Sequence, residues 1–415
     1  MKRILLFIFL VSNIHMLAQN PDPYEYMQDS YRYGIIVHGD IEAGSGAIDN
    51  SFLHAYYLGK HIDNSMKDRV RDRLSSSNRI GGDAEGSLYF FQGADSSFSN
   101  GKLDIFVGLK NRAHMDGLFS EDLFNVYFYG NKSFENKTIE TGKSNFSFYE
   151  YQELQAGIRK KIRKPDHQWA FTLGLSAISG QDYYGLVNKG SELYTAPDGE
   201  YLYVKTNAEL SRSSTKNSSF GAGNGVGSSL LLKMEYVKGN HNFSFMVSDL
   251  GFINWNSRST VLTTDTAFRY TGVYLKNIFD TLQINFSDTG FVNGMYNKSE
   301  KKSFLTVLPA WYQLAWQGKY LENRLLLGVT GKYRMLSNYV PQMKIEAGWK
   351  FAPLLTASVH VQYGGYADLG IGFHIHSALG KNFVLTLGSN YVDGLLLPSY
   401  RSGQQLNFSL LYLIK

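Results

Sequence analysis

Three histidines and one glutamate in the last quarter of the chain are the residues best suited to chemistry. His360 lies at an even position of one alternating segment, and His374 and His376 lie at even positions of the next. If these segments are strands joined by a tight turn, their even positions share one face, and a short preceding turn sets Glu346 opposite His360. Imidazoles and a carboxylate on one face can bind a metal or transfer protons.

Two interpretations of this cluster follow from the sequence. Polar, hydrated side chains are common on the inner face of a membrane barrel, and this reading is favoured. The alternative is a metal site or a hydrolytic centre. Because no complete ligand set is specified, we expect no resident metal and no cofactor.

Four cations fall on the same face of the preceding two segments, namely Lys332, Arg334, Lys344 and Lys350. A cationic wall in a confined channel would favour anionic solutes or lipid head groups. Scattered charges that keep a lumen wet are the commoner explanation.

Known catalytic patterns are missing from the 415 residues. The chain has no H-E-x-x-H pattern, no G-x-S-x-G pattern and no cysteine. The lack of cysteine excludes disulfides, thiolate zinc sites and thiol nucleophiles. We therefore expect a protein that is not an enzyme. A net charge of +5 is also too diffuse to indicate nucleic-acid binding.

Strands must position these residues, because polar and apolar residues alternate over most of the chain. Aromatic residues make up 15% and glycine is abundant, whereas proline is rare, as in proteins with many long strands. The alternation predicts sixteen strands, at about 84–95, 102–114, 122–131, 149–161, 168–179, 200–210, 228–238, 241–253, 268–285, 304–317, 324–335, 342–351, 355–364, 367–377, 382–392 and 405–414.

So many successive strands favour a closed barrel facing lipid over a soluble sandwich. We expect an all-β fold, a transmembrane antiparallel outer-membrane β-barrel of 14–16 strands, because the weakly patterned region 200–285 can lose a pair. With residue 415 in the periplasm, most long loops lie outside. The Ser/Gly-rich segment 211–227 breaks this rule, since the same topology places it inside.

The beginning of the chain has a different character. Lys2 and Arg3 precede an apolar run, and Ala18 precedes a polar stretch, which predicts a signal peptide over residues 1–18. We expect an N-terminal segment over 19–80 and a barrel over 81–415.

Two short helices are predicted within that N-terminal segment. Asn50 or Ser51 can cap the first, which ends at Gly59, and Asp63 or Asn64 can cap the second. Their apolar residues need a place to bury, and the predicted barrel mouth is near. We expect residues 41–80 to form a hatch or cap at the periplasmic end, with these packing residues: Phe52, Tyr56, Met66, Val70 and Leu74.

Three motifs resemble a Bacteroidota family of outer-membrane barrels known only as a domain of unknown function. They are residues 57–64 (YLGKHIDN), residues 78–83 (NRIGGD) and residues 249–255 (DLGFINW). The last contains the family-motif residues Asp249, Leu250, Gly251, Phe252 and Trp255. A looser likeness runs to fatty-acid-transporter-like barrels and to barrels associated with type IX secretion. The resemblance implies a bacterial outer-membrane location, and no catalytic residues.

Two functions remain open from the sequence. One is a hatch-gated or passive transport barrel for small or amphipathic solutes. The other is a structural or accessory subunit of an outer-membrane secretion or assembly complex, with a filled lumen. The expected partners are outer-membrane lipid and, in the second case, other outer-membrane or periplasmic proteins, with no nucleic acid.

Overall fold

The computed structural model describes residues 33–93, 103–142, 144–214, 221, 223–271, 298–352, 354–380 and 382–414. The expected signal peptide lies outside these ranges, as does most of the strand predicted at 268–285. Within the described ranges, the two predicted short helices and nearly all of the predicted strands can be compared with the structure.

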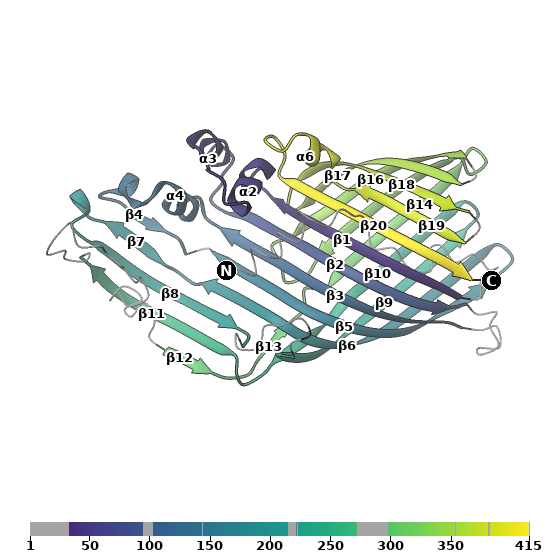
Figure 1. The fold of residues 1–415 in the computed structure, drawn as a ribbon, viewed down its shortest axis with the longest axis horizontal. Coiled ribbons are helices and arrows are strands. Elements are labelled where there is room, and N and C mark those ends of the chain that lie inside the picture. The colour runs from purple at the N-terminus through teal and green to yellow at the C-terminus, as the bar shows by residue number, and fades with distance from the viewer. Residues whose placement is uncertain are drawn as a thin grey trace.

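Fourteen antiparallel strands form a closed ring, which agrees with the expected barrel of 14–16 strands (Figure 1). The last strand pairs with the first, Tyr33 opposite Ile414, so the ring has no open edge. In ring order the strands are β1 (Tyr33–Ser45), β2 (Asn78–Gln92), β3 (Asp104–Phe119), β5 (Asn145–Arg163), β6 (His167–Asn188), β9 (Gly225–Lys238), β10 (His241–Trp255), β14 (Trp311–Tyr320), β15 (Leu325–Arg334), β16 (Val340–Ala352), β17 (Leu355–Gly365), β18 (Leu369–Leu379), β19 (Phe383–Ser389) and β20 (Gly403–Ile414).

Strand β1 corrects the expected domain boundary. The alternation predicts a barrel that begins at residue 81, but β1 pairs with both β2 and β20 and is a full member of the wall. Its alternation is easily missed, because Gly39 interrupts the apolar outer face and Gly34 and Gly44 interrupt the inner face that carries His38, Asp40 and Glu42. The barrel therefore begins before the two short helices.

The two ends of the barrel differ in the length of their connections. On the side where β20 ends, the turns 164–166, 239–240 and 321–324 are short, whereas the connections 46–77 and 256–310 at the other end are long. Long loops outside and short turns inside are typical of outer-membrane barrels. We name these the outer end and the periplasmic end.

Further strands extend the wall beyond the outer end. They are β4 (Thr138–Glu140), β7 (Glu192–Thr195), β8 (Leu202–Arg212), β11 (Thr260–Tyr270), β12 (Lys298–Lys301) and β13 (Phe304–Val307). Figure 1 shows the first five on the side away from the C-terminus, whereas β13 pairs with β10 of the wall. The strands β4, β7, β8, β11 and β12 are called the outer sheet below.

The outer sheet accounts for the misplaced segment 211–227. Strand β8 folds back on the outer part of β6 and does not cross the membrane. The amide of Ser213 bonds to the carbonyl of Tyr183, and that of Asn224 bonds to the carbonyl of Gly180, so both sides of the segment lie at the outer end. The prediction that residues 200–210 form a barrel strand is wrong for the same reason.

The predicted helices are present, but at the outer end. They are α2 (Asn50–Tyr57) and α3 (Asn64–Arg71), joined there by α4 (Glu121–Tyr129), α6 (Val392–Leu396) and the 3-10 turns η1 (Asn131–Phe134) and η2 (Pro197–Gly199). Helix α4 replaces the strand predicted at 122–131. A cap at the periplasmic end is therefore wrong, because β1 carries the chain across the barrel before α2 begins.

Side-chain caps and a small apolar core hold these helices together. Asp49 accepts from the amide of Phe52 at 2.9 Å, one residue before the expected cap, and Asp63 accepts from that of Met66 at 2.9 Å. Phe52 and Val70 are buried together with Phe124 of α4. Helices α2, α3 and α4 therefore share one hydrophobic cluster above the wall.

The two faces of the barrel wall have opposite chemistry. On β17, Val359, Val361 and Tyr363 are exposed on the outside, whereas His360 and Gln362 are buried on the inside. An apolar outer belt on a closed ring suits the lipid of a bacterial outer membrane, where such barrels reside. Among the described residues no helix is both long and apolar enough to cross a membrane.

Candidate functional site

The barrel lumen is the candidate site, and its outer half is crossed by an ion pair. Arg334 ends β15 and donates to Asp83 of β2, with Nη1 2.6 Å from Oδ1. These two strands lie on opposite sides of the ring. His114 of β3 also contacts Asp83, with its Nδ1 3.1 Å from Oδ1. The pair therefore ties the two sides of the wall together across the lumen.

A second bridge is centred on Arg112 of β3. Its guanidinium pairs with Asp249 of β10 and lies 2.5 Å from Oε2 of Glu85. Glu153 of β5 completes the group, with its Oε2 2.9 Å from Nζ of Lys110. All five side chains are buried or nearly so. Because buried carboxylates and cations are costly when unpaired, each one depends on the others.

The family motif around residue 249 supplies one carboxylate of this bridge. Asp249 has a φ of +60°, and the pairing of β10 with β9 shifts register between Val247 and Leu250. This bulge turns the Asp249 side chain toward Arg112 in the lumen. Gly251 is needed because a Cβ there would lie 2.1 Å from the carbonyl oxygen of Ser228.

The rest of that motif packs the outer wall. Trp255 is buried, and its Nε1 donates to Oγ1 of Thr306 on β13 at 2.9 Å. Leu250 and Phe252 are exposed on the lipid side. The motif thus supplies both a carboxylate in the lumen, Asp249, and a buried residue that packs the outer wall, Trp255.

Two turns fold inward over these bridges and contact β3 on the other side of the lumen. Tyr339 precedes β16 and Tyr366 follows β17, and both are buried. The Tyr366 hydroxyl donates to Oδ1 of Asp116 on β3 at 2.7 Å. Burial raises the pKa of Tyr366 well above its ordinary value, so the phenol keeps its proton and remains a donor. Gly81 leaves room for its ring, since a Cβ there would lie 2.2 Å from it.

Below these bridges the lumen contains a cavity of about 250 Å³. Its lining mixes apolar and aromatic side chains such as Tyr89, Phe106 and Met246 with polar ones such as Gln155 and Lys233. A smaller cavity of about 60 Å³ lies on the outer side. The residues that line both include Glu85, Arg112 and Lys332, so the Arg112 bridge separates the two spaces.

The periplasmic half has an apolar patch on its inner wall. Phe91, Phe106, Leu411 and Leu413 are buried there against Ile36 and Tyr89. The inner face of β20 is therefore polar at Gln405, Asn407 and Ser409 and apolar beyond them. This patch adjoins the larger cavity through Ile36, Tyr89 and Phe106.

The four predicted lumen cations have different environments. Arg334 is paired with Asp83, and Lys344 lies 3.5 Å from Oε2 of Glu346. Lys332 and Lys344 line the larger cavity, whereas Lys350 is exposed near the periplasmic end of β16. A continuous cationic wall is therefore absent among these four residues, because carboxylates neutralise part of it.

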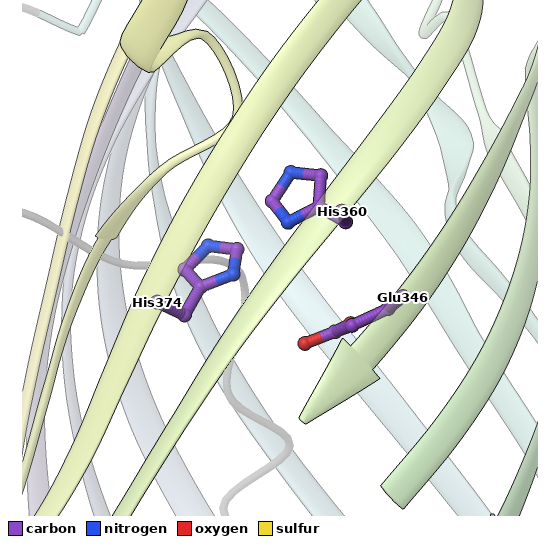
Figure 2. A group of neighbouring side chains, drawn as sticks. All are labelled: Glu346, His360 and His374. Atoms are coloured by element: carbon purple, nitrogen blue, oxygen red, sulfur yellow. The ribbon is translucent and has the colours of Figure 1, made fainter. Parts of the chain in front are cut away.

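The histidine cluster has the register that the sequence predicts. Glu346 on β16 pairs opposite His360 on β17, and His374 on β18 lies diagonal to His360 because Ser358 is its direct partner. Figure 2 shows the Glu346 carboxylate and the two rings pointing toward one another. The rings stack with their centroids 4.9 Å apart. His376 lies farther away, its Nδ1 3.0 Å from Oγ1 of Thr386.

The predicted hatch residues lie in the helix cluster of the outer end. Phe52 and Val70 are buried, Met66 and Leu74 pack beside them, and Tyr56 is partly exposed with its hydroxyl 3.0 Å from that of Tyr127. Helix α2 is fixed to the loop before β20, because the Asn50 amide donates to the carbonyls of Gly394 and Gly403. The helices are thus anchored to the rim.

Sequence reasoning missed the bridges that fill the outer half, including Asp83, Glu85, Arg112 and Glu153. One signal was present, because Lys110, Arg112, His114 and Asp116 occupy alternate positions of β3. Four such residues in succession on one face mark a strand that faces a polar interior. Glu85 and Glu153 lie directly opposite Arg112 and Lys110 on neighbouring strands, whereas the distant partners Asp249 and Arg334 carry no comparable signal.

A family model described as "Family of unknown function (DUF5723)" matches residues 30–390. No curated protein sequence matches the chain. Among solved structures, the Pseudomonas putida toluene transporter TodX is similar at 12% identity, covering 95% of this chain and 92% of that one with a TM-score of 0.45. The Ralstonia pickettii toluene transporter TbuX is similar at 9% identity, covering 93% and 90% with a TM-score of 0.40. The translocator domain of the autotransporter NalP from Neisseria meningitidis has 8% identity, covers 94% and 91%, and gives a TM-score of 0.33.

Proposed function

This chain belongs to the DUF5723 family, whose function is unknown, and from its lumen we propose that it is a gated transport barrel for small amphipathic solutes. The observation that carries the proposal is the cavity of about 250 Å³ in the lumen that the barrel wall encloses. A ring of 14 strands is wider than the barrels of about eight strands that wall side chains alone fill, and in this lumen the bridges and inward turns leave the cavity open.

The lining of this cavity suits an amphipathic solute. Phe106 and Leu231 offer apolar contact, and Gln155, Lys233 and Glu235 offer hydrogen bonds and charge. Sites for small molecules are typically apolar surfaces with a few polar groups that fix orientation. Lys233 and Glu235 lie 3.4 Å apart, so the cavity does not carry charge of one sign. Neutral or zwitterionic amphipathic molecules therefore match it better than simple anions.

The bridges of the outer half act as the gate in this proposal. A solute passing between the outside and the cavity must displace the Arg334–Asp83 pair, the Arg112 bridge and the inward turns at Tyr339 and Tyr366. The gate therefore lies in the lumen, and the anchored helices α2 and α3 are its outer support. This replaces the hatch expected from the sequence.

Single-channel recording in planar bilayers tests the proposal. The double variant Arg334→Gln/Asp83→Asn removes both charges of the cross-lumen pair without leaving one unpaired, and we expect larger or more frequent conductance steps than in the wild type. The matched control is Lys205→Gln/Glu192→Gln, which removes an ion pair of the outer sheet whose atoms lie 2.6 Å apart. Equal conductance in all three proteins would contradict a gate at this position.

The second candidate is a structural or accessory subunit of an outer-membrane complex. The cross-lumen pairs favour it, because a bridged lumen does not conduct and rigidifies the wall. To test it, residues 47–76 are replaced by a short Gly/Ser turn, which removes α2 and α3 and leaves β1 and β2 whole. For this function we expect loss of co-purifying outer-membrane or periplasmic proteins with no change in conductance. Raised conductance with unchanged co-purification would contradict it and support the gate.

A further inference from the structure

The space around His360 and His374 is built for two imidazoles. A Cβ at Gly372 would lie 2.1 Å from Nε2 of His360, and one at Gly388 would lie 1.8 Å from Cδ2 of His374. The rings therefore lie over two glycines of neighbouring strands, which hold them side by side on the lumen wall (Figure 2). Any larger residue at either glycine would displace a ring.

Neither ring nitrogen of His360 makes a hydrogen bond of good geometry, although the residue is only 2% exposed and Asn390 lies beside it. A poorly bonded imidazole is unusual in a buried position, because leaving such a group unsatisfied costs free energy. A bound ligand that accepts the lone pair of one ring nitrogen would remove this cost. The carboxylate of Glu346 and the ring of His374 are near enough to share such a ligand, since one donor atom of each residue lies within 4.8 Å of the others.

Neighbouring groups fix the orientation of these donors. Nε2 of His374 lies 3.3 Å from the side-chain amide of Asn407, which leaves Nδ1 free to coordinate. The Ser358 hydroxyl donates to Oε1 of Glu346 at 2.5 Å. Outer groups that orient histidine and carboxylate ligands in this way accompany metal sites in proteins. Asn407 and Ser358 are thus positioning residues.

We propose that Glu346, His360 and His374 bind one divalent transition-metal ion of the Zn²⁺ class on the lumen wall. Two imidazoles and one carboxylate form the donor set of open zinc sites, and they leave a coordination position for water or a solute. Glu346 also lines the larger cavity, so the ion is reached from the lumen. The site goes beyond the proposed transport function and does not depend on it.

The positive charge of Lys344 opposes binding of the metal ion. Its Nζ lies 3.5 Å from Oε2 of Glu346, so a metal must share this carboxylate with an ammonium group. The lysine stem is flexible, and its head can turn toward the cavity that it lines. Binding is therefore weaker than in a site without this cation, and removing the charge by Lys344→Met should tighten it.

Titration of the full chain with Zn²⁺ tests the site. The protein is purified in detergent without a histidine tag, and binding is followed by calorimetry. We expect one ion per chain in the wild type, loss of that binding in His360→Ala and in His374→Ala, and weakening by about 10–100-fold in Asn407→Leu. The matched control is His38→Ala, which removes another buried lumen histidine whose Nδ1 lies 3.2 Å from the carbonyl oxygen of Phe408.

Two further measurements keep the test decisive. Heat-modifiable migration on gels shows whether each variant is a closed barrel, and His360→Gln and His374→Gln replace any alanine variant that does not fold. Cu²⁺ bound in place of Zn²⁺ should show nitrogen coupling in its electron paramagnetic resonance spectrum, reduced in both glutamine variants. No binding in the wild type, or binding that both histidine variants retain, would overturn the proposal.

Discussion

The outer and periplasmic halves of the lumen have the same wall but different contents. In the outer half, Arg334 and Arg112 reach carboxylates on distant strands. In the periplasmic half, the apolar patch around Phe91 and Phe106 lies against the wall and leaves a cavity beside it. Alternation of polar and apolar residues builds the strands in both halves. Whether the lumen is bridged depends instead on which residue types occupy the inward positions.

The largest expected effect comes from breaking the outer bridge at its centre. In Arg112→Met, the carboxylates of Glu85 and Asp249 lose their cation while still buried, so we expect the barrel to lose about 3–5 kcal/mol of unfolding free energy. Denaturant unfolding in detergent, followed by gel migration, measures this. Lys205→Met, on the exposed pair of the outer sheet, is the control and should change stability little. A small loss at Arg112 would mean that water already solvates the bridge.

A second test asks whether both halves share one lipid-facing belt. Val361 is exposed on the outside of β17, near the middle of the strand, and Leu355 is exposed at its periplasmic end. Near the bilayer midplane, Val361→Lys should cost about 2–4 kcal/mol, whereas Leu355→Lys near the interface should cost about 0–1 kcal/mol. The same unfolding assay in lipid compares them. Equal costs would show that the belt has been placed at the wrong depth.

A smaller change sharpens the description of the periplasmic half. Ile36 is buried in the apolar patch, and Ile36→Val removes one methylene group there, so we expect a loss of about 0.5–1.5 kcal/mol. The neighbouring Ile35 points outward, where lipid fills the space, and Ile35→Val should have a smaller effect. The ratio of the two losses measures how tightly the patch is packed. If the two variants match, the patch is as loosely packed as the lipid contact.

The smallest expected effect concerns the helices above the outer half. Hydrogen bonding from the amide of Met66 lowers the pKa of Asp63, so the carboxylate stabilises α3 above the pKa that it has in the unfolded chain. This stability is lost as the pH falls through the lower pKa of the folded state. Amide exchange in α3, corrected for the intrinsic pH dependence, should therefore show protection falling under acid conditions. Asp63→Asn retains a capping oxygen without a titrating group and should remove this pH dependence.

The sequence predicts contacts between neighbouring strands better than contacts across the lumen. Glu346, His360 and His374 lie on strands joined by short turns, so local alternation sets their register. The Arg112–Asp249 pair joins residues 137 positions apart, and its geometry depends on closure of the ring and on a bulge with positive φ. Strand β1 escaped recognition because Gly34, Gly39 and Gly44 break its alternation of apolar and polar residues. Alternation along the sequence therefore predicts which residues face one another on neighbouring strands, but not which residues meet across the ring.

The length of β6 determines what the surroundings of the cell can touch. This strand has 22 residues, which at about 3.3 Å per residue gives roughly 70 Å along the strand, well beyond an apolar belt about 25 Å tall even when it is tilted. The outer sheet is carried on this excess length, in front of the lipid surface. Antibodies, bacteriophages and proteases approaching an intact cell therefore meet the outer sheet first. The barrel below it is shielded from them by the membrane.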